Sequence, residues 1–135
     1  MGWAKLYPCG HIESNTVRHL GDIDERMASF YFWIRDNLPT ETLVMERPQG
    51  LMGRALESQL GMIGIARALC RANEVKFIPV SPASVKKAAV GRGNTSGPNK
   101  VSKQEVIDWA EEKYGKEVST DEADALAVLE YWQQV

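Results

Sequence analysis

Apolar positions along the chain recur at two spacings, which predicts strands that alternate with helices. Short apolar runs between turn residues predict strands, whereas apolar residues three and four apart predict helices with one buried face. The expected strands are Trp3–Tyr7 with a turn into His11–Glu13, then Thr16–His19, Thr42–Glu46 and Val75–Val80. Hairpin strands come first and the later strands alternate with helices, so the order predicts an α/β fold, a mixed sheet with helices on both faces.

Five helices are expected, and most of them begin at a recognisable capping residue. Ser102 with Glu105 three residues later has the capping-box pattern, and Ser81 precedes a proline at the first helical position. The expected helices start at Asp22 or Asp24 and stop before Pro39, then run from Gly50 to about Ala72, Pro82 to about Val90, Ser102 to Gly115, and Asp121 to Gln133. Gly91–Lys100 is rich in glycine and proline and is predicted to be a loop.

Composition is ordinary for a globular protein, and it indicates one domain that spans residues 1–135. Hydrophobic residues make up 44% and charged residues 25%, and the net charge is −2, so nucleic-acid binding would need a local basic patch. Cys9 and Cys70 form neither a zinc pattern nor a disulfide framework, which fits a reducing compartment and a cytoplasmic location. No apolar run approaches the length of a membrane span.

Three carboxylates lie at the ends of predicted elements. Asp121 and Asp124 are three residues apart, so they share one face at the start of the last helix, and Glu46 ends a short apolar strand. Carboxylates in such positions suit a hard cation such as Mg²⁺, and two such ions are the usual machinery for phosphodiester cleavage. The alternative is that the aspartates only favour the helix dipole and that Glu46 pairs with Arg47.

Basic residues gather in the segment 86–103, which holds no acidic residue. They are Lys86, Lys87, Arg92, Lys100 and Lys103. Beside a nuclease site such a cluster would form a track for DNA phosphates, and otherwise it is an ordinary solvated surface.

Taken together, these residues resemble the RuvC-type Holliday-junction resolvases of the ribonuclease H-like nuclease superfamily. The resemblance covers nearly the whole chain, and its most specific part is Asp121-x-x-Asp124 followed by Ala-Leu-Ala. It implies a ribonuclease H-like fold in which Glu46, Asp121 and Asp124 are catalytic metal ligands. It further implies that Lys86 and Lys103 support DNA binding or the scissile phosphate, with Lys86 as a catalytic residue.

The function implied by the resemblance is Mg²⁺-dependent cleavage of four-way DNA junctions during recombination and repair. Two Mg²⁺ ions, or Mn²⁺ in their place, would be the cofactors. Branched DNA would be one partner and a second copy of the chain another. The small residues of the helix Gly50–Ala72 would form the dimer interface, or else they allow that helix to pack closely on the chain's own sheet. Two alternatives remain: a different ribonuclease H-like nuclease, and a non-catalytic protein of the same fold that binds branched DNA.

One part of the family pattern is missing. The family begins with a strand that carries Asp-x-Gly, followed by glycine and an aromatic residue, and Met1-Gly2-Trp3-Ala4 resembles the end of that motif. The aspartate is then expected upstream of Met1, and Asp22 and Asp24 fall at the start of a different element. We therefore expect the 135-residue chain to lack the front of the first strand and to cleave weakly or not at all.

Overall fold

The computed structural model describes residues 1–135, and the chain divides into two compact units. The terminal unit combines Met1–Arg18 with Ser81–Val135, and the middle unit is His19–Val80. None of the helices has both the length and the apolar character needed to cross a membrane.

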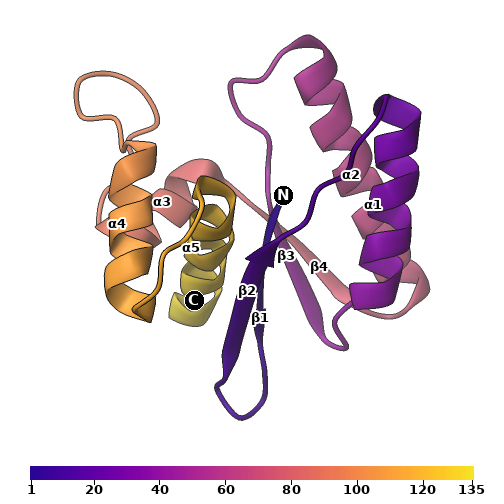
Figure 1. The fold of residues 1–135 in the computed structure, drawn as a ribbon, viewed down its shortest axis with the longest axis horizontal. Coiled ribbons are helices and arrows are strands. Elements are labelled where there is room, and N and C mark those ends of the chain that lie inside the picture. The colour runs from indigo at the N-terminus through magenta and orange to yellow at the C-terminus, as the bar shows by residue number, and fades with distance from the viewer. The chain divides into compact units, whose positions relative to one another are not determined.

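The terminal unit is an antiparallel hairpin packed on three helices. Its strands are β1 (Gly2–Leu6) and β2 (Ile12–Thr16), and its helices are α3 (Pro82–Val90), α4 (Lys103–Tyr114) and α5 (Thr120–Gln134). Helix α5 contacts both strands and both other helices (Figure 1). Burial of the apolar side chains at this junction stabilises the unit. They are Val85, Val101, Val106, Ala110, Ala123, Leu126 and Ala127.

The middle unit contains a parallel strand pair and two helices. The strands β3 (Thr42–Glu46) and β4 (Lys76–Val80) are hydrogen-bonded to each other, and α1 (Ile23–Asn37) lies beside α2 (Gly53–Ala72) (Figure 1). Gly61 of α2 allows this close approach, because a Cβ there would come within 2.7 Å of the Met27 sulfur. Strand β4 contains Pro79, which has no amide hydrogen to donate.

The predicted capping residues of three helices are confirmed. Asp22, and not Asp24, caps α1, and its side chain accepts a hydrogen bond from the Glu25 amide. The hydroxyl of Ser81 accepts from the Ser84 amide, and the capping box of Ser102 and Glu105 is present. These side chains satisfy amide groups that would otherwise have no partner at the first turn.

Two boundaries were predicted wrongly. No strand covers Thr16–His19: β2 ends at Thr16, and the short hairpin is closed by a hydrogen bond from the Tyr7 amide to the His11 carbonyl. Helix α2 begins at Gly53, because Gly50 and Gly53 have positive φ and keep the preceding segment out of the helix. The strands form two hydrogen-bonded pairs, one antiparallel and one parallel.

Candidate functional site

The acidic pair lies at the beginning of α5. The hydroxyl of Ser119 caps this helix and accepts a hydrogen bond from the Glu122 amide at 3.2 Å. Asp121 and Asp124 both keep solvent-accessible surface on the first turns, and Asp124 also has protein packed around its carboxylate. The pKa of Asp124 is raised, first because the surrounding protein removes water that would stabilise its charge, and second because Asp121 is also negative.

Two of the predicted lysines act on the same carboxylate. The charges of Lys86 and Lys103 both work to lower the pKa of Asp124, although burial and Asp121 outweigh them. Lys86 follows the buried Val85 in α3, and Lys103 is the first residue of α4. The terminal unit therefore brings four of the predicted residues into one electrostatic neighbourhood from three different helices.

The acidic pair has the chemistry of a partial metal site. Two carboxylates held near each other repel, and a divalent cation between them would relieve the repulsion that raises the pKa of Asp124. No group of three or more His, Cys, Asp or Glu side chains in residues 1–135 is placed to hold a metal ion. Glu46 ends β3 in the middle unit, so its approach to the acidic pair stays a prediction.

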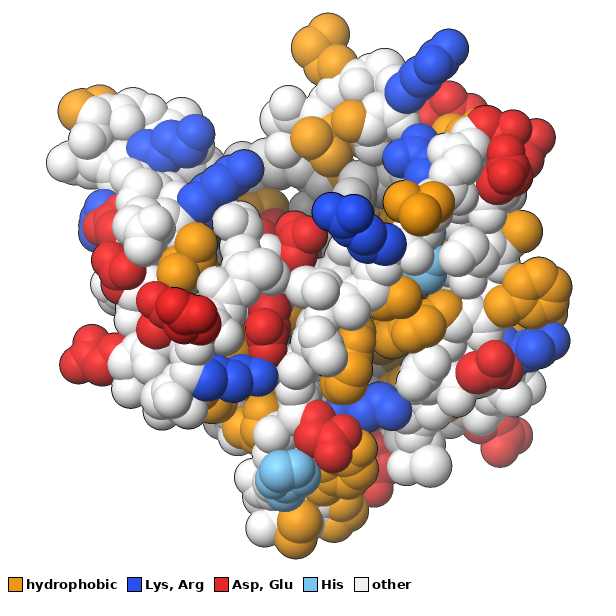
Figure 2. Space-filling model, viewed as in Figure 1, with side chains coloured by type: hydrophobic (Ala, Val, Ile, Leu, Met, Phe, Trp, Pro, Cys, Tyr) orange, Lys and Arg blue, Asp and Glu red, His pale blue; other side chains and the backbone are white.

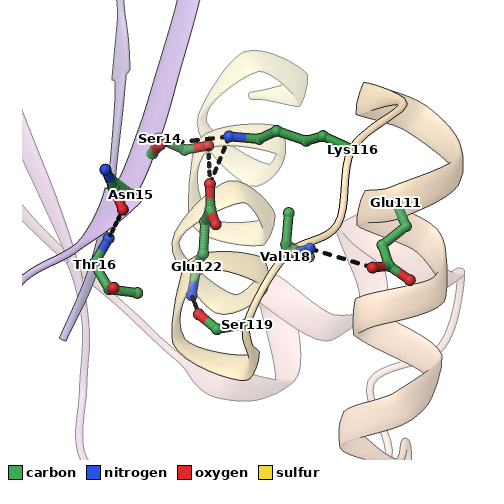
Figure 3. A network of polar contacts seen from close by, with 8 residues as sticks. All are labelled: Ser14, Asn15, Thr16, Glu111, Lys116, Val118, Ser119 and Glu122. Atoms are coloured by element: carbon green, nitrogen blue, oxygen red, sulfur yellow. Dashed lines mark hydrogen bonds and ion pairs between the residues drawn. The ribbon is translucent and has the colours of Figure 1, made fainter.

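Glu122, which sequence reasoning missed, is the buried acid of this region. Its carboxylate accepts hydrogen bonds from the Lys116 ammonium at 2.6 Å and from the Ser14 hydroxyl at 2.7 Å (Figure 3). Burial works to raise the pKa of Glu122, but these hydrogen bonds outweigh it and leave the pKa lowered. The network joins β2, the segment before α5 and α5 itself, so it fixes the helix that carries both aspartates.

A glycine lets the hairpin approach the same helix end. A Cβ on Gly2 would lie 1.8 Å from the carbonyl oxygen of Asp121, which no side chain tolerates. Strand β1 therefore packs against the backbone of the turn that carries the acidic pair. No signal in one sequence distinguishes this glycine from one in an ordinary turn.

The basic segment divides into exposed lysines and a paired arginine. Lys87, Lys100 and Lys103 are exposed, and Lys86 is partly buried. Figure 2 shows basic side chains over the 91–100 loop and the start of α4. Arg92 instead forms an ion pair with Glu105, with Nη2 at 2.7 Å from one carboxylate oxygen and 3.0 Å from the other. Its expected contact with DNA stays a prediction.

No protein-family model and no curated protein matches the chain. Solved structures do: RuvC of Thermus thermophilus is 19% identical with a TM-score of 0.64, covering 90% of this chain and 74% of that chain. The chain has a RuvC-like fold. A structure of T. thermophilus RuvC in complex with a Holliday junction substrate matches over the same shares, at 19% identity and a TM-score of 0.63. The likeness to RuvC confirms the predicted ribonuclease H-like α/β fold, and at this identity it shows the fold alone.

Proposed function

We propose that residues 1–135 form the nuclease domain of a structure-specific DNA endonuclease that acts on four-way junctions. Its main support is that α3, α4 and α5 of one compact unit carry Lys86, Lys103 and the acidic pair, and that the charges of Asp121, Lys86 and Lys103 all act on the pKa of Asp124. The RuvC-like fold and the neighbour's junction complex support this proposal. An acidic pair beside lysines is suited to hold a cation and a phosphate at one place.

The metal ligands in this proposal are Asp121, Asp124 and Glu46. Their carboxylates fit Mg²⁺, which prefers oxygen ligands, and Mn²⁺ would substitute. When bound, two such ions supply an activated water and stabilise the leaving oxygen. Lys86 and Lys103 would hold the scissile phosphate, since their charges already act on Asp124.

The DNA track in this proposal consists of lysines near the acidic pair. With a net charge of −2, the chain depends on this local patch for affinity. A homodimer through α2 would present two such sites to a symmetric junction. Gly64 of α2 has open space around it and is available for such a contact, whereas Gly61 is already used by Met27.

The test compares a four-way junction with linear duplexes of the same arm sequences. Binding is measured in Ca²⁺ and cleavage in Mg²⁺ or Mn²⁺. Asp124→Asn is expected to weaken metal binding and to spare junction binding, whereas Lys86→Met is expected to weaken junction binding. Glu112→Gln and Lys76→Met are the matched controls, because Glu112 and Lys76 are exposed and lie outside the proposed site.

The outcomes separate the possible functions. Equal affinity for junction and duplex would refute the junction-specific proposal. Selective binding of an RNA–DNA hybrid would instead identify another ribonuclease H-like nuclease. Junction binding that never leads to cleavage, even when an upstream strand with Asp-x-Gly is supplied, would identify a non-catalytic binding protein.

A further inference from the structure

The interactions of Arg92 set it apart from the lysines around it. Its Nη2 contacts both carboxylate oxygens of Glu105, and its Nε donates to the carbonyl oxygen of Asn99 at 3.2 Å. The same Glu105 carboxylate accepts from the Ser102 amide at 2.7 Å, as part of the capping box. Arg92 therefore joins both ends of the 91–100 loop to the first turn of α4.

The loop between these contacts is anchored at two further points. The Val101 amide donates to the Asn94 carbonyl at 2.8 Å, and the Val101 side chain is 2% exposed. A Cβ on Gly93 would come within 2.5 Å of the Ala83 carbonyl oxygen, so the loop lies directly on α3. The loop thus has a defined path although six of its ten residues are glycine, proline or asparagine.

Lys100 and Lys103 lie in the chain between Asn99 and Glu105, the two residues that Arg92 binds. Lys100 is exposed at the end of the loop, and Lys103 is the first residue of α4 and acts electrostatically on Asp124. Ordering a flexible segment during binding costs free energy, so a loop that is already ordered binds more tightly.

We propose that Arg92 is a positioning residue that clamps the 91–100 loop to Glu105 and so places Lys100 and Lys103 for DNA phosphates. This inference rests on the proposed function and deepens it. It replaces a direct phosphate contact by Arg92 with an indirect role. The negative charge of Glu105 would by itself oppose DNA binding. In this proposal Glu105 supports DNA binding, because it holds Arg92.

The direction in which Glu105→Gln changes DNA affinity distinguishes the indirect role of Arg92 from a direct phosphate contact. Glu105→Gln keeps the capping box, because glutamine serves at that position, and removes only the charge that Arg92 binds. Bulk electrostatics predicts tighter DNA binding after this loss of a negative charge. The clamp predicts weaker binding, by about twofold to fivefold, which is the range for a partly exposed ion pair. Glu112→Gln is the matched control.

The salt dependence gives a second measure. Lys100→Met is expected to lower the slope of log affinity against log salt by roughly one, because a phosphate contact is lost. Arg92→Met is expected to weaken binding without that change in slope, and Arg92→Lys to recover part of the affinity. Tighter binding by Glu105→Gln, or a slope lowered by roughly one in Arg92→Met, would overturn the clamp.

A measurement without DNA keeps this inference separate from the proposed function. In the free protein, the amides of Lys100 and Val101 are expected to exchange hydrogen faster in both Arg92→Met and Glu105→Gln. The control Glu112→Gln should leave them unchanged. If the wild-type chain binds no junction, the proposed function fails, while unchanged exchange in both clamp variants would refute the clamp itself.

Discussion

Replacement of Lys116 by methionine should destabilise the terminal unit through Glu122. Glu122 would keep the hydrogen bond from Ser14 but lose the ammonium at 2.6 Å, leaving a carboxylate that is only 11% exposed without a counter-charge. Breaking a buried pair costs about 3–5 kcal/mol, and exposed pairs contribute about 0.2–1 kcal/mol. Because the Lys116 side chain is 46% exposed, we expect an intermediate loss of about 2 kcal/mol.

The assay is urea unfolding of a double-mutant cycle with Lys116→Met and Glu122→Gln. A loss of this size corresponds to a fall in Tm of roughly 6–10 °C, and the two substitutions should be strongly non-additive. Lys87→Met is the control, since Lys87 is an exposed lysine of the same unit. A loss no larger than the control's, or an additive cycle, would refute the reasoning.

The contact between Lys116 and Glu122 also makes the stability of the terminal unit depend on pH. The pKa of Glu122 is lowered in the folded protein, so its contribution is present above the ordinary glutamate pKa of about 4.3 and is lost as pH falls through the folded value. The difference between wild type and Lys116→Met should therefore shrink on acidification. A constant difference down to pH 3 would contradict this assignment.

Further predictions concern individual residues. Gly2→Ala should destabilise the terminal unit by about 3 kcal/mol in urea unfolding, because its Cβ would overlap the Asp121 carbonyl. Gly64→Ala, on an open helix face, should instead stabilise by up to about 1 kcal/mol. Asp124→Asn should raise Tm near pH 7 and not near pH 3, because the raised pKa of Asp124 means that its ionised form opposes folding. A variant with the same Tm as the wild type at both pH values would refute this. The pKa of His19 is lowered by burial, so the middle unit should lose stability as pH falls below about 6.5, and His19→Phe should remove that loss in fluorescence-monitored unfolding.

Most of the secondary structure could be predicted from local signals in the sequence. The caps at Ser81 and Ser102 depend on residues within three positions, so a single sequence reveals them. The second strand was misplaced because a five-residue strand has little periodicity, and its register with β1 depends on the turn that joins them.

The site was predictable only where its residues follow a local pattern. Asp121 and Asp124 are visible as a helical pair, whereas Glu122 between them has a partner, Ser14, that is 108 positions away in the chain. Arg92 was grouped with the lysines because its charge is visible in the sequence and its pairing with Glu105 is not. Long-range pairing is decided by the tertiary fold, which one sequence does not display.

The proline in β4 has a consequence for how the chain behaves at high concentration. Prolines within sheets are confined to edge strands, so Pro79 protects β4 from adding further strands. Strand β3 has no such protection: Leu43, Val44 and Met45 are only partly covered, and β4 is its sole partner strand in this chain. We expect β3, and not β4, to be the strand through which copies of the protein pair at high concentration.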